Sequence, residues 1–297
     1  MNKLTGNNFK ANENRLARFF DSSEFMVEDK LWREYVKMLF ALLIERGYLR
    51  DGSNISINVD FTSKSDDFLI LSASIQFLGR SLPLYFSIRR YPVKAGMIDQ
   101  KKMESAFLLE LGRLLPREKY KYTIVADRGF ANIRFMEQCK RHGFNFAIRT
   151  PEKWNIEIDD WKGNMKELER ENKDLKIKLK SSEFECRLLT TFNKEGKGWY
   201  ILTDLDEESF DEIVERYKGR FQCEKMFQDE KSSGFEIEKS KIEKYSRFKR
   251  LLFCVYLAQS LMMFIGDWVN GEAEEIRKKY QLHINMISAF SNLQKGF

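Results

Sequence analysis

Four residues in the second half of the sequence have types and spacing that suit chemistry on an anion. The stretch "RYKGRFQCEKMFQDEK" (216–231) places Tyr217, Arg220, Glu224 and Lys231 in steps of three, four and seven. At about 100° per residue, this spacing predicts a shared helical stripe about 60° wide. A stripe with one carboxylate, one phenol and two cations has two interpretations. It is either a solvated salt-bridge face or a functional site.

Two further acids stand where strands are expected to end. Asp60 lies in the alternating segment "ISINVDF", and Asp127 follows the apolar segment "YTIVA". With Glu224 they make three carboxylates, and the chain has only 2 histidines, so an oxygen-only site for Mg²⁺ or Mn²⁺ is favoured over zinc. Two such ions about 3.5–4 Å apart act on phosphodiesters in nucleases and polymerases. Each acid alone also has a plainer interpretation, as a helix cap, a turn former or a solvated side chain.

The elements expected to position these acids are three strands followed by alternating helices and strands. Residues 53–90 alternate apolar and polar side chains, which predicts three antiparallel strands. A helix over about 99–115, a strand at "YTIVAD", a helix at "ANIRFMEQCKRHG" and a strand at "FNFAIRT" follow. We therefore predict an α/β fold with a mixed sheet of the ribonuclease-H-like type. In that topology the first and fourth strands are neighbours, which brings Asp60 beside Asp127.

The chain is expected to contain five segments. Residues 1–52 form an N-terminal helical region with basic side chains available for DNA, and 53–150 form the first part of the catalytic domain. Residues 151–205 form a β-rich insertion with a charged helical piece at 165–174. Residues 206–250 continue the catalytic domain with one long helix, which begins near Asp206 or Ser209 and delivers Glu224 to the site. Residues 251–297 form C-terminal helices.

With these residues in place, the chain resembles the DDE transposases of bacterial insertion sequences. More narrowly, it resembles the group with a Y-(2)-R-(3)-E-(6)-K signature, whose every step is matched here. The segments "NVDFTSK" (58–64) and "DRGF" (127–130) resemble the first and second aspartate blocks of the family, and "FAIRT" (146–150) resembles the strand that follows. The resemblance covers roughly residues 50–250.

The resemblance implies a role for each of these residues. Asp60, Asp127 and Glu224 would hold two Mg²⁺ or Mn²⁺ ions. Tyr217, Arg220 and Lys231 would grip DNA phosphate near the transposon end, as the planar fork of Arg and the point charge of Lys allow. The implied reaction is DNA cleavage at inverted-repeat ends, followed by transfer of the 3′-OH into target DNA by a dimer. No small-molecule substrate is implied.

Other residues near the expected site have two interpretations each. Arg128 and Arg149 either contact phosphate or neutralise the acidic cluster. Trp154, Trp161 and Trp199 either stack an extruded base, as the family's insertion implies, or are buried in a small β subdomain. Sequence alone leaves both pairs of interpretations open.

Composition limits the alternatives. Apolar residues make up 43% of the 297 residues, which excludes a largely disordered chain, and the formal charge of +6 permits a polyanionic partner. The apolar run at 251–266 is shorter than a bilayer requires, and the sequence begins with no signal peptide, so we expect a cytoplasmic protein without a membrane partner. Two other functions remain open: a nuclease of the same fold that joins no strands, and a decayed or domesticated DNA-binding copy. About 50 residues before the first strand, fewer than in related proteins, mildly favour the latter.

Overall fold

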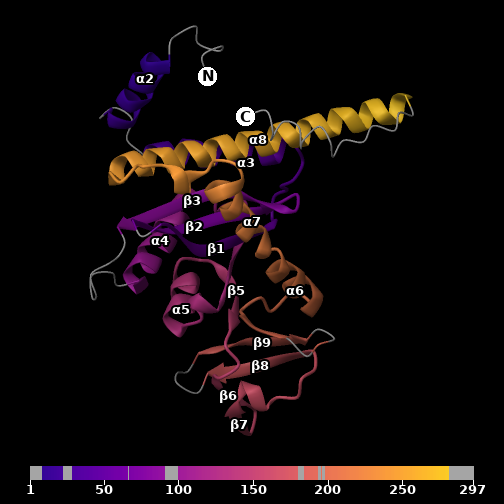
Figure 1. The fold of residues 1–297 in the computed structure, drawn as a ribbon. Coiled ribbons are helices and arrows are strands. Elements are labelled where there is room, and N and C mark those ends of the chain that lie inside the picture. The colour runs from indigo at the N-terminus through magenta and orange to yellow at the C-terminus, as the bar shows by residue number, and fades with distance from the viewer. Residues whose placement is uncertain are drawn as a thin grey trace. The chain divides into compact units, whose positions relative to one another are not determined.

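The computed structural model describes residues 9–22, 29–65, 67–90, 100–179, 184–192, 195 and 198–280. The chain divides into two compact units. One consists of Met1–Leu31 with Gln228–Phe297, and the other of Trp32–Phe227. The second unit contains a ten-stranded sheet in the order β3-β2-β1-β4-β5-β10-β9-β8-β6-β7 (Figure 1). The predicted α/β class with a mixed sheet is confirmed, and the arrangement is consistent with a ribonuclease-H-like domain.

The first three strands form the predicted antiparallel meander. They pair in sequence order and span β1 (Asn54–Lys64), β2 (Phe68–Phe77) and β3 (Arg80–Arg90). Ile55, Ile57 and Val59 are buried on one face of β1, as the period of two requires. Leu78 and Gly79, both with positive φ, form the two-residue turn between β2 and β3, which matches the type I′ turns that suit twisted hairpins.

The parallel part of the sheet places one aspartate within a strand and the other just after the neighbouring strand. The elements that follow the meander are α4 (Gln100–Leu114), β4 (Lys121–Ala126), the short 3-10 helix η1 (Arg128–Phe130), α5 (Ile133–Arg141) and β5 (Asn145–Thr150). β4 is parallel to β1, with Val59 opposite Ala126, and β5 is parallel to β4. Asp60 and Asp127 therefore follow paired residues, and the predicted neighbourhood of the first and fourth strands is confirmed.

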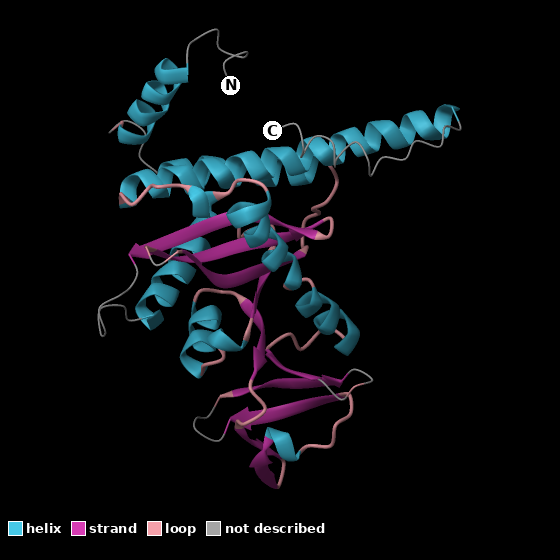
Figure 2. Cartoon of the chain, viewed as in Figure 1, coloured by secondary structure: helices cyan, strands magenta, loops and turns pink. Residues whose placement is uncertain are grey.

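The strands that follow β5 continue the same sheet, and Figure 2 draws them in magenta. These strands are β6 (Asn155–Ile158), β7 (Trp161–Asn164), β8 (Lys173–Leu179), β9 (Glu185–Phe192) and β10 (Gly198–Thr203), and β10 pairs antiparallel with β5. The charged helical piece predicted at 165–174 is wrong. Only a 3-10 turn, η2 (Met165–Glu167), is present, and Lys173 already pairs with Thr190 of β9. The alternation in "LKIKL" thus begins two residues earlier than expected and leaves no room for a helix.

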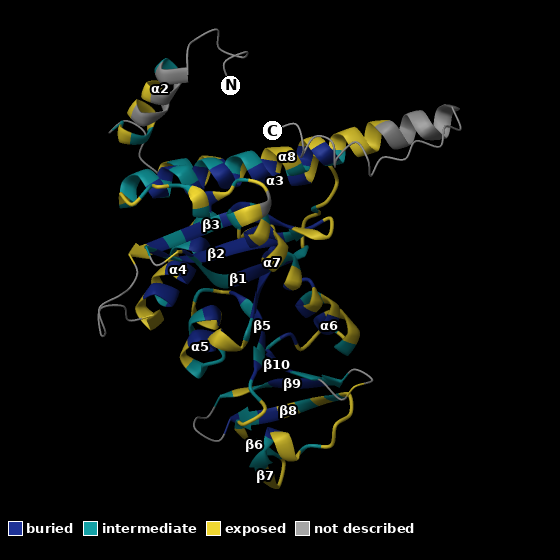
Figure 3. Cartoon of the chain, viewed as in Figure 1, coloured by how far each residue is buried: buried dark blue, intermediate teal, exposed yellow. Residues whose placement is uncertain are grey.

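The N-terminal part of the sheet-bearing unit is helical. From Trp32 onward, α3 (Asp29–Glu45) packs on β3, where the Trp32 ring makes edge contacts with Tyr85 and Phe86 at centroid distances of 5.0 and 4.9 Å. The Tyr35 hydroxyl donates a hydrogen bond to the Pro83 carbonyl at 2.8 Å. Figure 3 shows in dark blue that the buried residues of this unit lie along the strands and on parts of the neighbouring helices.

The long helix predicted from about residue 206 is wrong, because the helix breaks at Gly219. Ser209 begins it with a capping box that Glu212 completes, which confirms the expected start. The helical path then divides into α6 (Phe210–Lys218), α7 (Phe221–Gln228) and a π-helical turn η3 (Asp229–Ser233). Tyr217, Glu224 and Lys231 therefore lie on three different elements, and the signature is not one ideal stripe.

The other compact unit contains α2 (Phe9–Asp21) and α8 (Tyr245–Tyr280), besides η3 and the 3-10 turn η4 (Ile237–Lys239). Arg247 of α8 forms an ion pair with Asp21, and Arg250 donates to the Phe20 carbonyl. α8 extends well beyond the apolar run at 251–266, and by length and composition its stretch Tyr245–Glu272 would suffice to cross a membrane. The length argument made from sequence is therefore wrong. One such helix is weak evidence for a membrane span, because core helices of soluble proteins pass the same test, and 44% of its apolar 18-residue window is buried.

Candidate active site

Asp60 and Asp127 form the acidic centre of the candidate site. Asp60 lies in β1 with 19% of its side chain exposed, and its Oδ1 accepts a hydrogen bond from the Phe61 amide at 2.8 Å. Asp127 directly follows β4 and caps η1, where its Oδ1 accepts from the Gly129 amide at 2.8 Å. Burial, and then the charge of Asp127, raise the pKa of Asp60 to about 6, with a further contribution from Glu224. The capping role foreseen for Asp127 thus coexists with a place beside Asp60.

Arg220 links two of the three acids. Its Nη1 lies 3.2 Å from Asp60 Oδ2, and its Nη2 lies 2.7 Å from Glu224 Oε1. Arg220 is only 6% exposed, whereas the Glu224 side chain is 56% exposed. A buried guanidinium between two carboxylates compensates part of their mutual repulsion. Asp60 lies within β1 and Glu224 in the first turn of α7, so Arg220 joins these two elements.

Tyr217 lies against the same group of charges. Its side chain is fully buried, and within the described part of the chain its hydroxyl has no hydrogen-bond partner of good geometry. The pKa of Tyr217 is raised by burial, against the nearby charges of Arg220 and Arg149. Its ring packs against Trp199 at a centroid distance of 5.1 Å. A buried hydroxyl without a well-aligned partner is unusual in a folded protein.

Glu224, Asp127 and the signature residues lie inside a segment with a recognised family pattern. Residues 86–261, more than half of the chain, match the transposase DDE domain. The chain belongs to this family of DDE transposases. The match does not extend to Asp60, whose place in the site rests on its pairing geometry and its contact with Arg220.

Comparisons with other proteins add little to the family assignment of this DDE transposase. No curated protein matches it significantly. Among solved structures it is similar to an endonuclease V from Ciona intestinalis in complex with a 24mer DNA, at 12% identity and a TM-score of 0.33, covering 63% of this chain and 89% of that one. Human endonuclease V gives 14% identity and a TM-score of 0.32, covering 67% and 97% of the two chains. Similarity at this level carries no functional argument.

The remaining candidate residues of the transposase lie on different elements of the structure. Arg149 lies in β5, close enough for its charge to act on Tyr217, and Arg128 is exposed in η1 after Asp127. Lys231 belongs to the other compact unit, where its Nζ lies 3.7 Å from Glu238. Trp154 and Trp161 are different again, since they lie just before β6 and on β7, the last two strands in the sheet order.

Several residues in contact with the site were not singled out from the sequence. Phe221 is 39% exposed, packs against Trp199 at 5.7 Å and lies under the Arg220 guanidinium at 4.7 Å. Asn58 and Gln76 hold the turn that carries Arg220. Asn58 stands two residues before Asp60 on the same strand face, so alternation was the available signal. No local pattern distinguishes Gln76.

The three acids fit a divalent metal by the chemistry of their donors. They offer carboxylate oxygens only, and a cation would offset both the burial and the charge of Asp127 that raise the pKa of Asp60. In the described residues no three acidic, histidine or cysteine side chains lie close enough together to hold an ion. Arg220 lies between Asp60 and Glu224, so metal binding requires the guanidinium to leave at least one of them.

Proposed function

We propose that this DDE transposase cleaves DNA at inverted-repeat transposon ends and transfers the freed 3′-OH into target DNA, with two Mg²⁺ or Mn²⁺ ions held by Asp60, Asp127 and Glu224. The observation that carries the proposal is the contact of Arg220 with both Asp60 and Glu224, beside the neighbouring Asp127. The contact joins β1 to α7, and the pairing of β1 with β4 supports a place for Asp127 beside Asp60. Three carboxylates from separate elements beside a buried arginine suit phosphodiester chemistry.

Different residues of the chain would bind the metal ions and the DNA phosphate. Bound at the three carboxylates, the ions would lower the pKa of the attacking water or 3′-OH and stabilise the departing oxygen. Arg220 would exchange a carboxylate for a DNA phosphate oxygen, since its planar fork suits both. The buried Tyr217 hydroxyl, which lacks a partner of good geometry in the described part of the chain, would donate to the same phosphate. Lys231, Arg149 and the exposed Arg128 would add phosphate contacts along the backbone.

The tryptophans differ in how well they are placed to stack on a DNA base. Trp199 is half-buried and packs against Tyr217, so it is the one placed to stack a base beside the acids. Trp161 is 38% exposed on the last strand of the sheet and would contact DNA only at a distance from the acids. The proposed partner is DNA, with two protomers holding two ends in the cytoplasm.

One reaction tests the proposal and separates it from its alternatives. Purified protein is incubated with Mn²⁺ or Mg²⁺, a plasmid target and DNA that carries the inverted repeats flanking the gene. Joined products are the expected result. Cleavage without joining would indicate the nuclease instead. Binding that needs no metal, with neither cleavage nor joining, would indicate a DNA-binding copy.

A further inference from the structure

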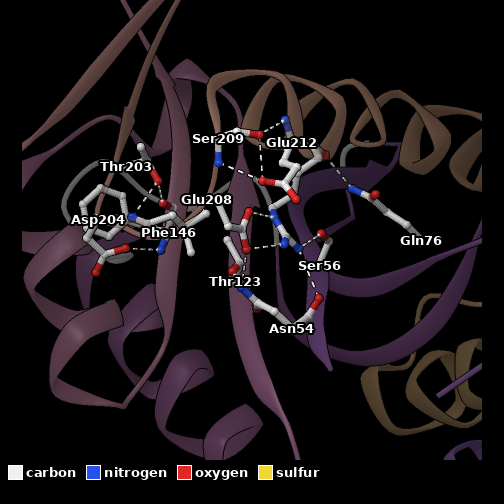
Figure 4. A network of polar contacts seen from close by, with 12 residues as sticks. Asn54, Ser56, Gln76, Thr123, Phe146, Thr203, Asp204, Glu208, Ser209 and Glu212 are labelled. Carbon is white, nitrogen blue, oxygen red and sulfur yellow. Dashed lines mark hydrogen bonds and ion pairs between the residues drawn. The ribbon is translucent and has the colours of Figure 1, made fainter. Parts of the chain in front are cut away.

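Alternate residues of β1 form hydrogen bonds with α6 and with the residue just before its cap. Asn54 Nδ2 donates to Glu208 Oε1 at 2.7 Å, just before the helix begins. Two residues further along the strand, Ser56 Oγ accepts from Arg216 Nη1 at 2.6 Å in the last turn of α6. Arg216 in turn forms an ion pair with Glu208 at 2.5 Å. Figure 4 shows Asn54, Ser56 and Gln76 directed from the strands toward this helix.

Asn58, the next polar residue on this face of β1, binds the end of α6. Asn58 Nδ2 donates to the Gly219 carbonyl at 3.2 Å and to Ser81 Oγ at 3.1 Å. Gln76 Nε2 donates to the Arg216 carbonyl at 2.8 Å and to Asn58 Oδ1 at 3.0 Å. Two side-chain amides from neighbouring strands thus bind two carbonyls at the end of α6. We call Asn58 and Gln76 the amide clamp.

Gln76 supplies the Arg216 carbonyl with a partner that the helix does not, because the Arg220 amide donates to the Tyr217 carbonyl instead. The last carbonyls of a helix have no amide four residues further on to accept from, and burial makes such groups costly unless they are paired. Asn58 is fully buried, so water does not replace it. The clamp therefore specifies where α6 ends and where the turn begins.

Gly219 allows this close approach. Its φ of −58° suits any residue, so glycine is not required for the backbone conformation. A Cβ at this position would instead collide with the amide group of Gln76. The absence of a side chain is what brings the turn down onto the clamp.

We propose that Asn58 and Gln76 are positioning residues, which fix the Gly219 turn so that Arg220 and Glu224 begin at a set place relative to Asp60. Arg220 directly follows the clamped residue, and Glu224 lies one helical turn later in α7. Asp60 lies two residues beyond Asn58 on the same strand. The clamp thus joins the strand that carries the first acid to the segment that carries the third. Its effect on catalysis rests on the proposed function, whereas its effect on the turn does not.

Two variants open the clamp from opposite sides. Gln76→Met keeps the side-chain length and removes both donated hydrogen bonds. Gly219→Ala places a Cβ where the Gln76 amide lies, so it separates that amide from the turn from the helix side and tests the proposal even if Gln76→Met fails to fold. Ser74→Ala is the matched control, because Ser74 is opposite Asn58 in β2, is fully buried, and its hydroxyl has no hydrogen-bond partner in the described part of the chain.

The first readout is cleavage under saturating DNA and Mn²⁺. Both clamp variants should lower kcat by about 100-fold, as a displacement of about 1 Å at a phosphoryl-transfer site does. DNA affinity should change little, because it comes from many phosphate contacts. Ser74→Ala should retain wild-type kcat. Wild-type kcat in both clamp variants would overturn the proposal.

The second readout needs no DNA and no activity. The amides of Gln222 and Cys223 donate to the carbonyls of Gly219 and Arg220 at 3.1 and 2.9 Å, so their hydrogen exchange reports the turn. Exchange there should accelerate in both clamp variants while β4 amides stay protected, which separates local displacement from unfolding. Unchanged exchange in both variants would overturn the clamp. If the wild type itself cleaves no DNA, the proposed function fails, and the exchange measurement still decides whether the clamp holds the turn.

Discussion

The indole of Trp199 packs edge-on against the buried ring of Tyr217, with an interplanar angle of 65° and ring centroids 5.1 Å apart. The aromatic residue best placed to meet a DNA base is therefore also part of the wall that holds the signature tyrosine.

Replacing Trp199 should consequently affect both stability and DNA. Trp199→Ala removes the packing on Tyr217 and on Phe221, and we expect a loss of about 3 kcal/mol in the free energy of unfolding, measured by urea denaturation. Trp161→Ala, on an exposed side chain, should change it by less than about 0.5 kcal/mol. Equal losses in the two variants would contradict the packing role of Trp199.

Glu224 offers the sharpest test of the proposed metal site. Glu224→Gln keeps the shape of the side chain and removes its charge, so cleavage with Mg²⁺ should disappear. DNA binding in a gel-shift assay should persist, because Arg220 keeps its contact with Asp60. Because the Glu224 side chain is 56% exposed, the variant should also remain folded. Full cleavage activity in this variant would remove Glu224 from the site.

Asp60 predicts a particular dependence of stability on pH. Its pKa is about 6 in the folded chain, against an ordinary value of 3.8. Between these values the folded state keeps a proton that the unfolded state has lost, so the free energy of unfolding falls as the pH rises from about 4 to about 6. Above about pH 6, ionised Asp60 causes no further fall in the free energy of unfolding. In Asp60→Asn this part of the pH slope should vanish in chemical denaturation without metal, and an unaltered slope would contradict the assignment.

Metal affinity should show the opposite trend over the same range. A carboxylate binds a divalent ion only when ionised, so Mn²⁺ binding measured by calorimetry should strengthen as the pH rises through about 6. Binding that is independent of pH in this range would indicate that Asp60 is not a ligand.

Lys231 is predicted to act through charge alone. Lys231→Ala should weaken DNA binding for every sequence and reduce the slope of log affinity against log salt by about 1. Lys218→Ala, in which a solvent-exposed lysine paired with Glu215 is removed, serves as a control on the same segment of the chain. If the two variants have the same salt slope as the wild type, Lys231 makes no phosphate contact.

The sequence predicted the structure best where an element follows from the local spacing of apolar and polar residues. Alternation from Ile55 to Phe61 predicted β1 and its polar face, and the order of elements was enough to place Asp60 beside Asp127. The break at Gly219 was missed because residues on both sides are good helix formers and the glycine keeps a helical φ of −58°. The clamp was also missed, because it joins Asn58, Gln76 and Gly219, which are far apart in the sequence and meet only through strand pairing and helix packing.

The pairing of Thr150 with Tyr200 has a consequence for the architecture of the chain. The chain leaves β5 after Thr150 and returns in β10 opposite that residue, so the two ends of the segment between them are fixed side by side. Loop-closure entropy grows only slowly with length, and the intervening segment is therefore free to lengthen, shorten or be exchanged without changing the register of β4 and β5. A change of length between these two ends would leave Asp60 beside Asp127, because their neighbourhood depends on the pairing of β1 with β4.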